Sequence, residues 1–159
     1  MTQADSPKDR VLAAADALGV TTRLIEHQPV RSLAEAAEAR GVEPADVIKT
    51  MVVRRGEGDY VLVLVPGDRV ISWPKLRSAL GVSRLSMPDA DEAREVTGYA
   101  RGTITPFGTS TTLPVIADER MRGRVVTLGA GEHNRAIAVD ADAALAALEA
   151  VVADVTEAE

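Results

Sequence analysis

The chain reads VIKTMVVRRGEGDYVLVLV from Val47 to Val65, two apolar runs separated by a glycine-rich turn. The runs Val47 to Arg54 and Tyr60 to Val65 are rich in β-branched residues, which favours β-strands. The sequence Gly56-Glu57-Gly58-Asp59 between them is typical of a hairpin turn. We therefore expect an antiparallel β-hairpin at the centre of the fold.

A single lysine interrupts the first of these strands. Because side chains alternate between the two faces of a strand, Lys49 shares one face with Val47, Met51 and Val53. An ammonium among such neighbours costs desolvation free energy unless it lines a pocket or binds an anion. The alternative is a lysine on an edge strand whose ammonium reaches water and discourages pairing with other chains. The pattern alone favours this second interpretation.

Helices and strands follow one another irregularly around this hairpin. Expected helices begin at capping residues Ser6, Ser32, Ser72, Asp89 and Asp140, and the last one runs to about residue 152. Further strands are expected over residues 21–26, 113–117, 124–128 and 135–139. This order indicates one α+β domain over residues 1–152, with a mixed, β-barrel-like sheet surrounded by short helices. Residues 153–159 are expected to form a frayed acidic tail.

Two glycine-rich segments lie in the second half of the chain. Gly98 to Gly108 holds three glycines and one proline, which allows backbone N–H groups to approach a ligand but equally suits a structural turn. Gly129-Ala130-Gly131 lacks the residues that complete a dinucleotide or P-loop motif. We interpret His133 as a loop histidine. His27 is either a surface histidine at a turn or a residue at a pocket rim.

Composition narrows the chemistry. The 159 residues include no cysteine and two histidines, which excludes thiolate chemistry and argues against a histidine-rich metal site. No Gly-x-Ser-x-Gly sequence marks a serine nucleophile. A net charge of −6 excludes a protein that coats nucleic acid, but not contact with one end of a nucleic acid. No apolar run approaches the roughly 20 residues that span a bilayer. We expect no metal, no cofactor, no membrane or DNA partner, and a cytoplasmic location.

Four stretches together resemble the YbaK-type aminoacyl-tRNA deacylases, which are relatives of the editing insertion domain of bacterial prolyl-tRNA synthetases. They span about residues 10–150, nearly the whole chain. The resemblance implies an α+β domain with a barrel-like core that hydrolyses the ester between a wrong amino acid and the 3′ end of a tRNA. In chain order the stretches are His27-Gln28-Pro29-Val30 with Glu35-Ala36-Ala37, Val47-Ile48-Lys49-Thr50, Gly98-Tyr99 through Thr105-Pro106-Phe107-Gly108, and Gly129-Ala130-Gly131.

The resemblance also implies roles for single residues. Lys49 and Gly102 fall on catalytic positions: the lysine would hold a phosphate or the carbonyl oxygen, and N–H groups around Gly102 and Gly131 would stabilise the oxyanion. Thr103 and Thr105 stand where glycine and serine are frequent in the family, and both add bulk beside the pocket. Substrate-binding roles are expected for seven residues: His27, Thr50, Tyr99, Thr103, Thr105, Gly129 and Gly131.

The expected partner is an aminoacylated tRNA, bound at its 3′ end and carrying a small, misattached amino acid. An aminoacyl-tRNA synthetase that delivers it would be a second partner. Two other functions fit the same residues. One is a non-catalytic module that binds a free amino acid or a charged tRNA for regulation, and the other is a hydrolase of a different small ester.

Overall fold

The central hairpin forms as predicted, in a computed structural model that describes residues 6–159. Strand β2 (Ile48–Gly56) pairs antiparallel with β3 (Asp59–Pro66), and Lys49 lies opposite Val65. The hairpin belongs to a four-stranded sheet in the order β2-β3-β5-β8, in which β5 (Val115–Asp118) and β8 (Val151–Ala153) run parallel to β3. Residues 61–65 of β3 are all buried, because both faces of this central strand are covered.

A second sheet of three antiparallel strands lies beside the start of β2. Its order is β1 (Arg23–Glu26), β7 (Arg135–Asp140) and β6 (Val125–Gly129). An isolated bridge between Val47 and Thr127 joins it to the central sheet. The α+β, single-domain prediction is confirmed, but the sheets do not close into a barrel, because each remains a separate hydrogen-bonded unit.

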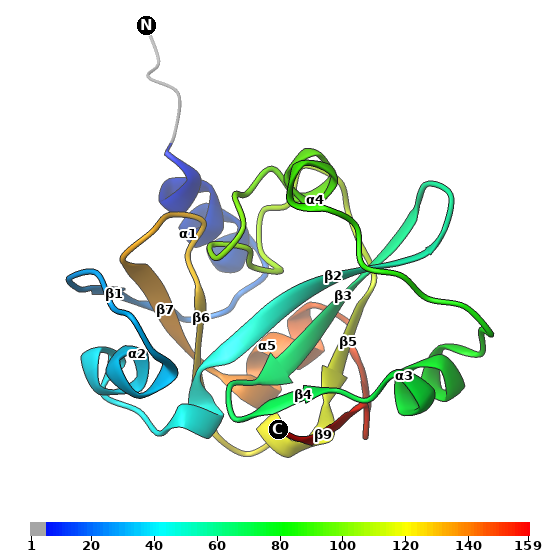
Figure 1. The fold of residues 1–159 in the computed structure, drawn as a ribbon. Helices are drawn as coiled ribbons and strands as arrows, with labels where there is room; N and C mark the ends of the chain where they lie inside the picture. Colours follow the sequence, from blue (N-terminus) through cyan, green and yellow to red (C-terminus); the bar gives the residue numbers. More distant parts are fainter. Residues whose placement is uncertain (1–5) are drawn as a thin grey trace, which may run out of the picture.

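The helices begin close to the predicted capping residues. They are α1 (Pro7–Ala17), α2 (Leu33–Arg40), α3 (Trp73–Leu80), α4 (Ala90–Thr97) and α5 (Ala141–Ala147), with single 3₁₀ turns η1 (Pro44–Asp46) and η2 (Glu119–Met121). Figure 1 shows α4 next to the β2–β3 hairpin, and α3 beside β4 (Arg69–Ile71) and β9 (Thr156–Ala158). No helix among residues 6–159 is both long enough and apolar enough to cross a membrane.

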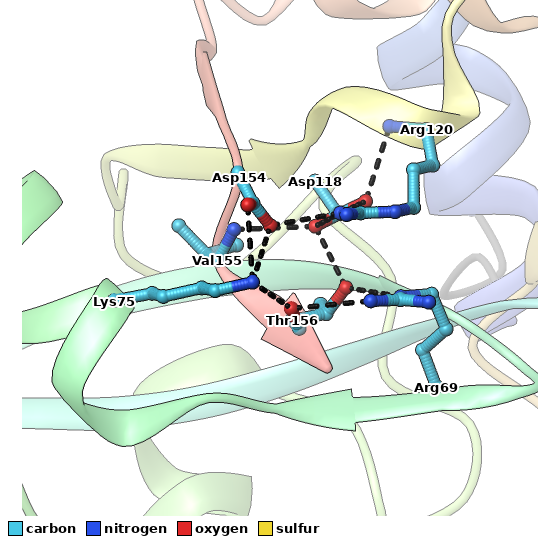
Figure 2. Close-up of polar contacts among 7 residues, drawn as sticks. All are labelled: Arg69, Lys75, Asp118, Arg120, Asp154, Val155 and Thr156. Carbon is cyan, nitrogen blue, oxygen red and sulfur yellow. Dashed lines mark hydrogen bonds and ion pairs between the residues drawn. The ribbon is translucent and has the colours of Figure 1, made fainter. Parts of the chain in front are cut away.

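The chain end differs most from the prediction. The last helix stops at Ala147, and residues 153–159 are not a frayed tail: β9 pairs antiparallel with β4, and Val155 and Thr156 are fully buried. Figure 2 shows why this segment is held. The buried carboxylate of Asp118 accepts hydrogen bonds from the N–H of Val155 (3.2 Å) and from Thr156 Oγ1 (2.8 Å). Arg120 and Lys75 both pair with Asp154.

The two faces of β2 contribute to two different cores. Ile48 and Val52 belong to the larger cluster, which α1, α5 and the second sheet complete. Val53 belongs to a smaller cluster beneath α3, and Met51 packs against it. This is the alternation expected for a strand. Lys49 therefore stands on the side of the smaller core, and Thr50 on the side of the larger one.

Candidate active site

A cleft of about 650 Å³ runs along β2. Its other lining residues come from the start of α4, the segment between α4 and β5, the last residue of α2 and the last residue of β6. The lining residues used below are Arg40, Lys49, Thr50, Asp89, Arg101, Gly102, Ile104 and Gly129.

Four of the predicted site residues meet in this cleft. They are Lys49 and Thr50 from β2, Gly102 from the loop after α4, and Gly129 from the end of β6. The hydroxyl of Thr50 is buried and has no hydrogen-bond partner among residues 6–159. A buried hydroxyl without a hydrogen-bond partner is uncommon in folded proteins. These residues come from three separate parts of the chain.

Lys49 enters the cleft without a carboxylate partner. Within the described part of the chain, no Asp or Glu oxygen lies within 4.0 Å of its ammonium, which instead donates a 2.7 Å hydrogen bond to the main-chain oxygen of Arg69. An ammonium has three donors, so this bond orients the group and leaves two donors for an anionic or carbonyl oxygen.

Gly102 offers an unused backbone N–H at the cleft. Its φ of +86° is a conformation that residues with a Cβ rarely adopt, and the residue is exposed. Among residues 6–159, its N–H donates to no other group. A carbonyl oxygen placed against this loop could accept from it, which is the arrangement that stabilises an oxyanion.

The same loop is held close to β6 by Gly129. A Cβ on Gly129 would lie 3.0 Å from the main-chain oxygen of Ile104 and 3.1 Å from that of Thr103, closer than side chains normally allow. Gly131 has a different part: its N–H donates to the oxygen of Thr103 (3.0 Å), and it packs against the ring of Tyr99. The N–H of Gly131 itself is therefore already engaged within the protein.

The other predicted binding residues lie outside the cleft. Tyr99 is buried in the larger core and donates to the oxygen of Phe107 (2.7 Å), and burial raises the pKa of its hydroxyl. Thr103 is buried and donates to the oxygen of Ala100 (2.6 Å). Thr105 is fully buried. Their roles are in the packing of this segment, and Ile104 between the two threonines is the side chain that reaches the cleft.

Neither histidine lines the cleft. His27 follows β1, where its N–H donates to the oxygen of Asn134 and its Nδ1 lies 2.7 Å from the oxygen of Gln28. His133 is exposed and lies near Gly102: a Cβ on Gly102 would lie 3.8 Å from the Cε1 atom of His133. Their positions support a structural part for His27 and place His133 next to the loop of Gly102.

The cleft residues that sequence reasoning did not assign include Arg40, Arg101 and Ile104. Arg40 ends α2, and its Nη1 donates to Thr127 Oγ1 (3.1 Å). Burial lowers the pKa of its guanidinium below the ordinary value. Arg40 looks like an ordinary charge at the C-terminus of an alanine-rich helix, so the sequence carries no signal that this side chain turns inward.

The charge of the cleft is opposite to that of the whole protein. Its lining carries three cations, Arg40, Lys49 and Arg101, and one carboxylate, Asp89. That carboxylate already accepts the N–H of Glu92 as the N-cap of α4. In a chain of net charge −6, such a local excess of positive charge favours an anionic ligand.

Several known proteins are similar to this chain. The proline–tRNA ligase of Trichlorobacter lovleyi is 35% identical over 88 residues, which are 55% of this chain and only 15% of the ligase. The prolyl-tRNA editing protein ProX of Acetoanaerobium sticklandii is 28% identical over 123 residues, 74% of each chain. A solved structure of a candidate trans-editing enzyme for prolyl tRNA synthetase has a TM-score of 0.87 and 29% identity, covering 98% of this chain and 99% of that one.

A family model covers the residues that build the cleft. The model of the aminoacyl-tRNA editing domain matches residues 27–146, from the end of β1 to α5. Arg40, Lys49, Gly102 and Gly129 all fall within this range, whereas β8 and β9 lie beyond it. Since the match extends over most of the chain, the protein belongs to the aminoacyl-tRNA editing domain family.

Proposed function

We propose that this protein is a trans-acting hydrolase that removes a misattached small amino acid from the 3′ end of a tRNA. The observation that carries the proposal is that Lys49 and Gly102, whose N–H donates to no other described group, both line one cationic cleft. An aminoacyl ester is already activated, so one cation and one backbone dipole are enough to lower the free-energy barrier to its hydrolysis. Relatives named as editing proteins support this choice of substrate.

In the proposed reaction, the oxygen of a water molecule attacks the ester carbonyl carbon. The carbonyl oxygen becomes an oxyanion that the N–H of Gly102 and the Lys49 ammonium stabilise. The bond between this carbon and the ribose 3′ oxygen then breaks, and the proton released by water ends on that oxygen. The neighbouring ribose 2′ hydroxyl assists the water, which is consistent with the lack of a carboxylate pair at the cleft.

Size selects the amino acid in this proposal. Ile104 and the apolar side of β2 limit the space beside Gly102, so a small side chain enters and a large one does not. In this proposal the activity needs no metal ion, and the EDTA arm of the assay below tests this. A cytoplasmic location and delivery of tRNA by a prolyl-tRNA synthetase accompany the proposal, because the matched ligase contains a related segment.

The test is a deacylation assay with a panel of tRNAs charged with glycine, alanine, serine, cysteine or proline. We expect turnover of at least one small aminoacyl ester, unchanged by EDTA when the tRNA stays folded in monovalent salt. The same panel with a prolyl-tRNA synthetase added tests delivery. Tight binding of charged tRNA without turnover would instead support the regulatory module, and turnover of simple esters alone would support the third function.

A further inference from the structure

Arg40 is half-buried and lines the cleft. Three other half-buried arginines, Arg54, Arg55 and Arg135, each pair with a carboxylate, whereas Arg69 and Arg77 do not within the described residues. Arg40 pairs with none within the described residues, and its Nε is buried without any hydrogen-bond partner there. A buried donor without a partner is costly, so such a group calls for an explanation.

The hydrogen bond to Thr127 does not neutralise this charge. It uses Nη1 of Arg40 and a hydroxyl that is itself fully buried, which fixes the direction of the side chain. A guanidinium has five donors in a planar fork, and this fork matches the oxygens of a phosphate. Arg40 is thus oriented in advance and lacks only an anion.

We propose that Arg40 binds a phosphodiester of the tRNA 3′ end, the one on the 5′ side of the terminal nucleoside. This inference rests on the proposed function. It assigns separate tasks to residues that line one cleft: Arg40 holds the backbone phosphate, and Lys49 and Gly102 act on the ester. Arg40 is then a binding residue, whose contact is the same in the ground state and the transition state.

The test compares two non-hydrolysable ligands. Both are 3′-alanylamino-3′-deoxyadenosine, an amide in place of the ester, and one of them carries a 5′-phosphate methyl ester with the single charge of a phosphodiester. Calorimetry measures the Kd of each for the wild type and for Arg40→Gln. We expect the phosphate group to tighten binding to the wild type about tenfold or more, and to give no gain with Arg40→Gln.

The ligand without phosphate should bind both proteins equally. Arg40→Lys should recover part of the phosphate gain, because it retains the charge without the fork. Arg122→Gln is the matched control: it removes an exposed arginine that lies away from the cleft, and it should keep the full gain. Melting temperatures of all variants show whether each one is folded.

Hydrolysis of full-length charged tRNA provides a second measurement. Arg40→Gln should raise KM with little change in kcat, and the slope of log(kcat/KM) against log salt should fall in magnitude by about 0.7, the value for one phosphate contact on a single strand. The assignment would be overturned if the phosphate group still tightened binding to Arg40→Gln. It would also be overturned if Arg40→Gln lost the same affinity for both ligands, or if neither ligand bound to the wild type. Absence of turnover with intact ligand binding would instead contradict the proposed function alone.

Discussion

The ammonium of Lys49 donates a 2.7 Å hydrogen bond to the main-chain oxygen of Arg69, the first residue of β4. The guanidinium of that same Arg69 bonds to Thr156 Oγ1 (2.7 Å) and to the main-chain oxygen of Thr156 (3.3 Å). Thr156 in turn donates to the buried Asp118, as Figure 2 shows. The C-terminal strand, which lies beyond the residues matched by the family model, is therefore linked to the lysine of the cleft through Arg69.

Replacing Lys49 with alanine should lower kcat/KM for deacylation by at least about a hundredfold, because a cation facing the developing oxyanion is lost. The melting temperature should change by only a few degrees, since the variant loses a half-buried charge and no core side chain. Lys8→Ala is the control, because Lys8 pairs with Asp9 on α1, outside the cleft. Turnover close to that of the wild type would contradict the proposed mechanism.

Thr156→Val tests the link from the chain end to Lys49. Valine keeps the shape but removes the hydroxyl that bonds Arg69 and Asp118, at a cost of about 2 kcal/mol. The melting temperature should fall by roughly 4–8 °C. At a temperature where the variant is fully folded, kcat should also fall severalfold, because β4 then holds Lys49 less firmly. Glu157→Gln, an exposed change on the same strand, should alter neither quantity. If Thr156→Val lowered the melting temperature but left kcat unchanged, β9 would contribute to stability and not to the position of Lys49.

Acid should weaken the attachment of the C-terminal strand. Hydrogen bonds and charge from Arg120, and then from Lys75, lower the pKa of Asp154 to about 2. Burial by itself would raise the pKa of Asp118, but hydrogen bonds from Thr156, Arg120 and Val155 outweigh it and lower the pKa. A carboxyl whose pKa is lower in the folded protein stabilises it above the unfolded pKa, and this stabilisation is lost as the pH falls through the folded value.

The melting temperature should accordingly decline between about pH 4 and pH 2, a window set by these lowered pKa values. Circular dichroism of a pH series measures it. Asp154→Asn should have a lower melting temperature than the wild type near neutral pH. Its melting temperature should also fall less steeply with acid, since only Asp118 of the two carboxyl groups remains to titrate. A wild-type melting temperature that stays constant over this range would contradict the prediction.

Gly102→Ala should reduce turnover strongly, because a methyl group enters the wall from which the N–H faces the ester. Its positive φ adds a stability cost of about 1 kcal/mol. Gly58→Ala is the matched control: Gly58 also has a positive φ, +68°, but it lies in the β2–β3 turn with no atom near its added Cβ. The two variants should lose similar stability, and only Gly102→Ala should lose activity. Equal activities of Gly102→Ala and Gly58→Ala would indicate that the loop around Gly102 is a structural turn without a part in catalysis.

Ile104→Ala should widen the cleft and admit larger amino acids. Removing three carbons from the wall should shift the preference toward a larger side chain by about tenfold or more, since each methylene is worth roughly 1–3 kcal/mol in an apolar pocket. Competition assays with tRNAs charged with different amino acids measure this ratio. Thr103→Ser should leave the ratio unchanged, because the hydroxyl of Thr103 faces Ala100 and not the cleft.

Local patterns predicted much of this structure. The valine-rich runs around Gly56 to Asp59 form the hairpin, and Ser6, Ser32 and Asp89 each cap the expected helix with a side-chain hydrogen bond. These features depend on interactions within a few residues, which a sequence displays directly. The strand around Lys49 and the glycine loop around Gly102 were also visible, and the fold brings them to one cleft.

Other features arise from contacts between distant residues. The strand β9 has no apolar alternation, and it is ordered because Asp118, 38 residues before Thr156, supplies a buried acceptor. Arg40 turns inward because Thr127, 87 residues further on, accepts its hydrogen bond. The loop register that sends Ile104 to the cleft and Thr103 into the packed interior is likewise imposed by the close approach of Gly129. Such pairings satisfy polar groups that lose water on folding, so they depend on which surfaces meet and leave no periodic trace along the chain.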